Sequence, residues 1–106
     1  MKYVVDIDGT ICVNATVGDY SSAEPFTSRI EKLNGLKKAG STIVYFSARG
    51  MDTFNGDIER CKEEYLELTQ SQLNAWGVDY DDIILGKPSG DFYIDDKGMS
   101  CHEFFY

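Results

Sequence analysis

The sequence predicts an α/β fold in which a parallel sheet of about four to five strands is flanked by helices. Apolar, strand-like runs alternate along the chain with stretches of helical periodicity, a pattern typical of parallel sheets. The first run, residues 3–5, is rich in β-branched side chains and indicates a buried central strand. It is followed by Asp6 and Asp8, which share a face because residues two apart on an extended backbone point the same way. We therefore expect both carboxylates at the sheet edge where α/β proteins bind ligands.

The next part of the chain predicts a strand–helix–strand unit. Residues 11–24 are mixed in type and show no period, so we expect a short flap there. Apolar residues recur at helical spacing from Phe26 to Ala39, and Gly40 ends the helix. Residues 42–46 form the next buried strand, which makes this a right-handed parallel unit.

The second half of the chain repeats the alternation. A long polar helix is expected over residues 57–76, followed by short strands at 83–85 and 92–94. The tail, 99–106, is expected to add one short edge strand. One side of the long helix carries a stripe that is mostly apolar: Ile58, Cys61, Tyr65, Leu68, Gln72 and Ala75.

Length, charge and cysteine content limit the class of protein. A chain of 106 residues suits a single domain, 1–106, and it contains no apolar run long enough to span a membrane. Cys12, Cys61 and Cys101 are an odd number without CxxC spacing, and the N-terminus shows no signal-peptide pattern. Reduced thiols and a cytoplasmic location are the expectation. A net charge of −8 makes nucleic acid an improbable partner without excluding it.

Polar side chains also follow the later strands. Ser47 comes after the second strand, Lys87 after the third, and Asp95 and Asp96 after the fourth. Singly, each has an ordinary explanation as a turn cap, a surface lysine or the start of a loop. Because the carboxyl ends of parallel strands meet at one edge, together they predict a site containing acids, a hydroxyl and one cation.

Two carboxylates held close together repel each other unless a cation lies between them or one is protonated. Asp6 and Asp8 therefore indicate either a divalent cation or acid–base chemistry. The alternative is a solvated, Asp-rich turn at the end of a strand.

These motifs resemble those of the haloacid dehalogenase (HAD) superfamily of Mg-dependent phosphotransferases. Residues 6–10, with the sequence DIDGT, match its first motif, Ser47 its second, Lys87 its third and the pair 95–96 its fourth. The spacing within 86–97 is also similar to that of small HAD-like proteins of capsule polysaccharide synthesis. The resemblance implies a three-layer, Rossmann-like fold without a cap domain.

The resemblance also implies a mechanism. Asp6 would be the nucleophile that forms an aspartyl-phosphate, and Asp8 the general acid and base. Mg²⁺ would be held by an Asp6 oxygen, the Asp8 backbone carbonyl and one carboxylate of the fourth motif, with Asp96 as direct ligand and Asp95 beside it.

The remaining motif residues would hold the substrate. Ser47 and Lys87 would bind the transferring phosphoryl group, and Gly9 would allow a close backbone approach. Arg49 could touch the substrate or be a plain surface arginine. The full substrate-binding set implied by the resemblance is Gly9, Thr10, Ser47, Ala48, Arg49 and Lys87.

The substrate is the least determined feature. The resemblance favours a small phosphorylated metabolite, with a sugar phosphate as the first choice and a polynucleotide 3′-phosphate as the second. A phosphorylated receiver-like module and a catalytically silent HAD-like binding protein are the alternatives of another class. With no cap and with apolar Val13, Val17 and Tyr20 in the flap, a homo-oligomer that covers the site is a further expectation.

Overall fold

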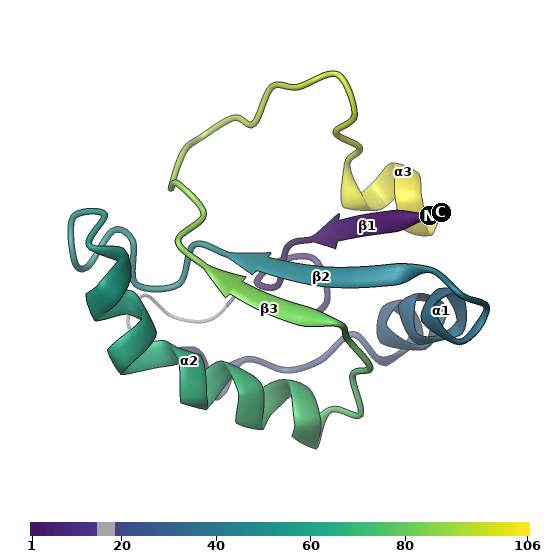
Figure 1. Cartoon of the computed structure of the whole chain (residues 1–106), viewed down its shortest axis with the longest axis horizontal. Helices are drawn as coiled ribbons and strands as arrows, with labels where there is room; N and C mark the ends of the chain where they lie inside the picture. The colour runs from purple at the N-terminus through teal and green to yellow at the C-terminus, as the bar shows by residue number, and fades with distance from the viewer. Residues whose placement is uncertain (15–18) are drawn as a thin grey trace.

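The computed structural model describes residues 1–14 and 19–106 and contains a three-stranded parallel sheet (Figure 1). The strands are β1 (Lys2–Val5), β2 (Thr42–Ser47) and β3 (Asp82–Leu85), in the order β1-β2-β3. Val4 pairs with Val44. Phe46 pairs with Ile84. The expected α/β class and parallel pairing are confirmed, and the carboxyl ends of all three strands lie at one edge.

Two long helices connect the strands. Helix α1 (Thr27–Lys38) joins β1 to β2, and α2 (Ile58–Ala75) joins β2 to β3, close to the expected bounds. The α2 N-terminus is capped by Asp57, whose carboxylate accepts a hydrogen bond of 3.2 Å from the Arg60 amide. A short 3₁₀ helix, η1 (Tyr20–Ser22), precedes α1.

The core lies on one face of the sheet. Ile43 and Tyr45 of β2 are fully buried and pack in one cluster with Leu33 of α1 and Leu73 of α2. Phe104 of the C-terminal helix α3 (Cys101–Phe105) packs on Tyr3 of the same face, with ring centroids 5.6 Å apart. All three α-helices therefore cover the same side.

No described helix covers the opposite face of the sheet, although Val44 in its centre is only 6% exposed. Val4 and Ile84 point to this face and are 60% and 44% exposed. The third layer of the expected fold is therefore not formed by the described residues. The chain between Lys87 and Ser100 contains no helix that could cover this face.

The expected sheet of four to five strands is wrong, because residues 92–94 form no strand. Phe92 and Ile94 are 85% and 94% exposed, and the chain from Gly86 to Ser100 runs outside the sheet edge (Figure 1). A local turn competes with strand extension here, since Asp95 Oδ1 accepts from the amides of Lys97, at 2.6 Å, and Gly98.

The tail is helical rather than an edge strand. Ser100 caps α3, its hydroxyl accepting a hydrogen bond of 3.1 Å from the Glu103 amide. Ser100 and Glu103 have the spacing of a capping box, a helix-start signal that outweighs the β-propensity of the aromatic tail.

Three sequence expectations concern features outside the sheet. Residues 15–18 of the expected flap, Val17 among them, lie outside the described residues. Cys12, Cys61 and Cys101 are free thiols. No helix in the described ranges is long and apolar enough to cross a membrane.

Candidate active site

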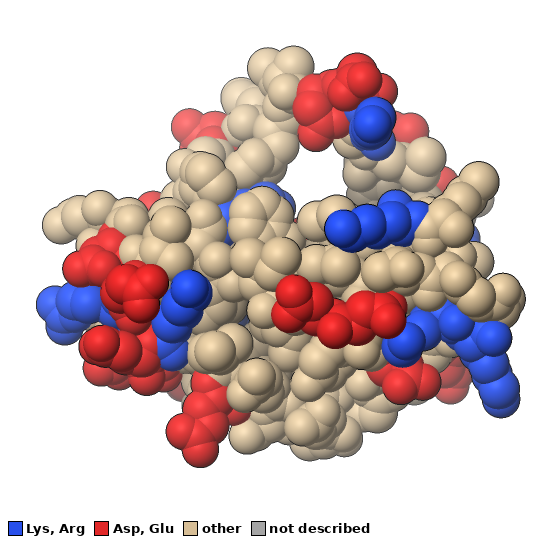
Figure 2. Space-filling model, viewed as in Figure 1, with Lys and Arg blue, Asp and Glu red and all other residues tan. Residues whose placement is uncertain are grey.

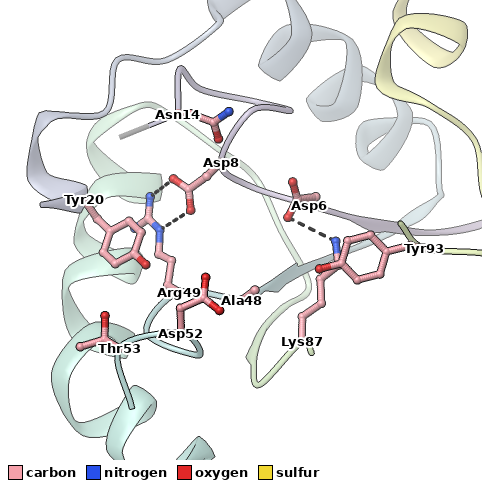
Figure 3. A pocket seen from close by; sticks show the side chains of 10 residues that line it. All are labelled: Asp6, Asp8, Asn14, Tyr20, Ala48, Arg49, Asp52, Thr53, Lys87 and Tyr93. Carbon is pink, nitrogen blue, oxygen red and sulfur yellow. Dashed lines mark hydrogen bonds and ion pairs between the residues drawn. The ribbon is translucent and has the colours of Figure 1, made fainter. Parts of the chain in front are cut away.

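The three strand ends open into a pocket of about 270 Å³ (Figure 3). Its lining combines carboxylates, two cations, two tyrosines and small polar groups. The lining residues are Asp6, Asp8, Asn14, Tyr20, Ala48, Arg49, Asp52, Thr53, Lys87 and Tyr93. Five of these residues were predicted from the sequence to belong to the site: Asp6, Asp8, Ala48, Arg49 and Lys87. The other five belong to none of the sequence motifs: Asn14, Tyr20, Asp52, Thr53 and Tyr93.

Asp6 lies between a cation and a hydroxyl. Lys87 Nζ is 3.4 Å from Asp6 Oδ1, and the Thr10 hydroxyl donates to Asp6 Oδ2 at 3.2 Å. Lys87 reaches this position because its amide continues the β2–β3 ladder, donating to the Ser47 carbonyl at 3.1 Å. The Asp6 carboxylate is therefore held in one orientation and kept in contact with a positive charge.

Asp8 is held by a bidentate ion pair with Arg49. Arg49 Nε donates to Asp8 Oδ2 at 2.9 Å, and Nη2 donates to Oδ1 at 3.0 Å. Arg49 is only 1% exposed, so its interpretation as a surface arginine is wrong. A planar guanidinium fixes a carboxylate in this fork geometry more precisely than a lysine does.

The turn after β1 is closed by backbone hydrogen bonds. The amides of Thr10 and Ile11 both donate to the Ile7 carbonyl at 3.0 Å. Gly9 has a φ of +84°, and a Cβ there would lie 3.0 Å from Asn14 Oδ1, so the glycine is required at this point. Arg29 of α1 donates to the Thr10 carbonyl at 3.0 Å. The turn that carries Asp8 is therefore rigid.

Arg49 is in turn held by α2 and by Tyr20. Its Nη1 donates to Thr69 Oγ1 at 3.1 Å and to Gln72 Oε1 at 2.6 Å. The Tyr20 ring lies 4.8 Å from the guanidinium carbon. Sequence reasoning missed these contacts, although one signal was present: Gln72 is a polar residue within the apolar stripe of the helix.

Ser47 lies beneath the pocket rather than on its surface. It is buried, and its hydroxyl accepts a hydrogen bond of 3.1 Å from the Arg49 amide. In this arrangement Ser47 shapes the turn that presents Arg49. Ala48, between them, lines the pocket.

The acidic pair Asp95 and Asp96 does not lie with Asp6 and Asp8. Both belong to the exposed segment 88–100, and neither lines the pocket. Figure 2 shows acidic side chains at the outer end of this segment and an open gap between the segment and the sheet edge. Within the described ranges, no three His, Cys, Asp or Glu side chains are grouped so that they could hold a metal ion.

The formal charges of the pocket are nearly balanced. The carboxylates of Asp6, Asp8 and Asp52 face the cations Arg49 and Lys87, which leaves a net charge of −1. Burial, with a smaller contribution from the Asp8 charge, raises the pKa of the Cys12 thiol to about 12. The thiol is therefore protonated near neutral pH, and its weak 3.6 Å hydrogen bond to Asp8 Oδ1 is a donation. Cys12 is not a nucleophile in this state.

Comparison with known proteins shows the fold and a relative. No protein-family model and no curated protein matches the chain. The crystal structure of an MCSG target from Vibrio cholerae is 34% identical in sequence, with a TM-score of 0.90, over 98% of this chain and 86% of that one. The chain therefore belongs to the same family as that protein.

Proposed function

We propose that this protein is a phosphomonoester hydrolase that works through an aspartyl-phosphate on Asp6. The observation that carries the proposal is the constellation at the strand ends. One carboxylate is oriented by Lys87, a second is oriented by Arg49, and both open into one pocket. Phosphoryl transfer depends on positioning a nucleophile and neutralising phosphoryl oxygens, which these residue types supply.

In the first step, an Asp6 carboxylate oxygen attacks phosphorus and the bond from phosphorus to the substrate oxygen breaks. Asp8, in its protonated form, gives its proton to the departing oxygen, so the alcohol leaves neutral. Lys87 contacts Asp6 at 3.4 Å and is placed to neutralise phosphoryl oxygens next to it.

In the second step, water attacks the aspartyl-phosphate and Asp8 takes the proton from that water. Inorganic phosphate leaves, Asp6 is regenerated and Asp8 carries the proton for the next cycle. The bidentate pair with Arg49 uses both Asp8 oxygens as acceptors, which is the carboxylate form needed at this stage. When Asp8 then holds the proton for the first step, one of these two hydrogen bonds from Arg49 opens to make room for it.

The other nominated residues have supporting roles in this proposal. The Arg49 guanidinium has five N–H groups, of which four are directed at Asp8, Thr69 and Gln72, so one stays available for a phosphoryl oxygen. Ala48 lines the pocket and allows a close approach of substrate, Gly9 shapes the turn that carries Asp8, and Thr10 orients Asp6 through its hydroxyl. Ser47 would act through the turn that carries Arg49.

Mg²⁺ belongs to the proposal, although the described carboxylates do not form a Mg²⁺ site as they are arranged. The Asp6 carboxylate is engaged by Lys87 and Thr10, and the fourth-motif pair lies in the exposed segment 88–100. For this reason the two steps above use only side chains of the chain. A cation is favoured on electrostatic grounds, since a pocket of net charge −1 repels a phosphate dianion that arrives alone.

A sugar phosphate is the substrate class that the pocket favours. Its volume of about 270 Å³ suits a small ligand, and Asn14, Asp52 and Thr53 offer polar groups to hydroxyls. A polynucleotide 3′-phosphate is disfavoured because Asp52 and the overall charge of −8 repel a polyanion.

The test is turnover of an aryl phosphate with and without Mg²⁺, followed by a panel of sugar phosphates, nucleotides and 3′-phosphorylated oligonucleotides. We expect Mg-dependent turnover, abolished by Asp6→Asn, with a sugar phosphate preferred. Absence of turnover of every compound, with Mg²⁺ present, would reject an enzymatic role and favour a binding module.

A further inference from the structure

Gln72 and Thr69 lie outside the sequence motifs, yet they contact the buried cation that holds Asp8. Both belong to α2, one helical turn apart, so they present neighbouring polar groups to Arg49. Thr69 is fully buried. Burying a polar group costs free energy unless the group is hydrogen-bonded. Here both side chains accept a hydrogen bond from the same nitrogen, Arg49 Nη1.

The Arg49 guanidinium has little freedom once Nη1 is engaged. The fork is planar, so fixing Nη1 on Thr69 and Gln72 fixes the direction of the opposite edge, formed by Nε and Nη2. That edge makes the two hydrogen bonds to Asp8. Orientation is therefore passed from α2 through the guanidinium to the Asp8 carboxylate.

Gln72 also reaches the element before α1. Its side-chain amide donates to the Tyr20 carbonyl at 2.5 Å, while its oxygen accepts from Arg49. The Tyr20 ring lies against the guanidinium, and its hydroxyl accepts a hydrogen bond of 3.1 Å from the Gly50 amide. Gln72 thus connects η1, α2 and the Arg49 turn at one point.

We propose that Gln72 and Thr69 are positioning residues for Asp8, which they orient through the Arg49 guanidinium. This inference rests on the proposed function, because it assigns them to the group that exchanges the proton in both steps. They do not touch the reacting atoms. Loss of their hydrogen bonds lets Arg49 and Asp8 rotate together and misplaces the proton donor.

The first experiment measures kcat and KM for an aryl phosphate in paired variants. Gln72→Met removes both hydrogen bonds at similar length, and Gln70→Met makes the same change at an exposed position of α2. Thr69→Val removes the hydroxyl at nearly constant shape, and Thr69→Ser restores it. We expect Gln72→Met to lower kcat about 10- to 100-fold with KM within about twofold, because proton transfer suffers rather than binding.

The controls give that result its meaning. We expect Thr69→Val to lower kcat in the same direction, and Thr69→Ser and Gln70→Met to turn over as the parent does. A kcat for Gln72→Met within about twofold of the parent would overturn the inference, as would a rise in KM at unchanged kcat. Circular dichroism and thermal melts confirm that each variant is folded.

A second measurement does not depend on turnover. The Arg49 Nε–H, buried in its pair with Asp8, gives an NMR signal protected from solvent exchange, and the signal is assigned by its loss in Arg49→Lys. We expect exchange to quicken at least about tenfold in Gln72→Met and to stay unchanged in Gln70→Met. Unchanged exchange in Gln72→Met overturns the positioning role, whatever the activity. If the parent hydrolyses no phosphate while the exchange result holds, the proposed function fails and the positioning contact stands.

Discussion

The pocket end of the sheet and the segment 88–100 differ in how firmly their residues are held. Arg49 is 1% exposed and makes four side-chain hydrogen bonds, whereas Ile94 is 94% exposed and Asp95 bonds only within its own turn. The first acidic pair directly follows a paired strand, and the second follows a run without a strand partner. The position of a motif in the fold depends on the residues packed around it. A good sequence match therefore predicts where the motif lies only when the strand beside it pairs with another strand.

The largest expected effect tests the firmly held region. Asp6→Asn keeps the size of the side chain and removes the charge that attacks phosphorus, so we expect turnover to fall at least ~10³-fold. Steady-state assays of an aryl phosphate measure this fall, and a melting curve checks that the fold is kept. A variant that stays within tenfold of the parent would show that Asp6 is not the nucleophile.

The next prediction compares the core that supports the pocket end of the sheet with the exposed segment. Leu33→Ala removes a fully buried side chain of α1 and is expected to lower the free energy of unfolding by about 2–5 kcal/mol. Ile94→Ala makes the same kind of truncation in the exposed segment and should change it by less than about 0.5 kcal/mol.

Urea denaturation of the parent and of both variants measures these changes. A loss above about 1.5 kcal/mol for Ile94→Ala would mean that the segment packs against the protein in solution, and the contrast between the two regions would disappear.

A smaller effect is expected at the second acidic pair. If Asp96 binds Mg²⁺, Asp96→Asn should raise the Mg²⁺ concentration needed for activity strongly, whereas Asp95→Asn should cost about 10- to 100-fold in affinity or activity. This outcome requires the segment to bring the pair to Asp6. Titration of activity with Mg²⁺ after chelation and dialysis measures the requirement. Parent-like Mg²⁺ dependence in both variants would mean that the pair takes no part in the site.

Much of the fold was predictable because local patterns agreed with packing. Apolar runs located the three strands, and helical spacing located α1 and α2. The carboxyl ends of parallel strands lie at one edge of the sheet, and for this reason Asp6, Ala48 and Lys87 were expected to meet, as they do in one pocket. These features depend on the alternation of strand and helix and on short-range geometry, and both can be read from one sequence.

The rest depended on contacts between distant residues. Arg49 can be buried because Thr69 and Gln72 of α2 accept its hydrogen bonds. The sequence around Arg49 gives no indication of these two partners. Residues 92–94 carry the right propensity for a strand, but propensity does not supply a partner. The polar residue in the helix stripe, Gln72, was the one usable signal, and it indicated a buried polar contact without naming it.

The smallest expected effect concerns a buried hydroxyl group in β2. Tyr45 of β2 is fully buried, and its hydroxyl has no hydrogen-bond partner among the described residues. A buried unsatisfied hydroxyl costs free energy, so Tyr45→Phe is expected to stabilise the protein by about 1 kcal/mol. The matched control, Tyr93→Phe in the exposed segment, removes a hydroxyl that donates to the Pro88 carbonyl at 2.7 Å and should be nearly neutral.

The pH dependence of the stability difference between Tyr45→Phe and the parent tests this explanation. Burial raises the pKa of the Tyr45 hydroxyl above its ordinary value of 10.0. The unfolded chain therefore releases this proton at a pH where the folded protein still holds it, and the parent loses stability as the pH rises past 10. The Phe variant lacks that loss, so its advantage over the parent should be larger at pH 10.5 than at pH 8. Urea denaturation at both pH values measures it. A destabilised Tyr45→Phe, or an advantage that shrinks with pH, would mean that the hydroxyl has a partner in solution, such as a bound water.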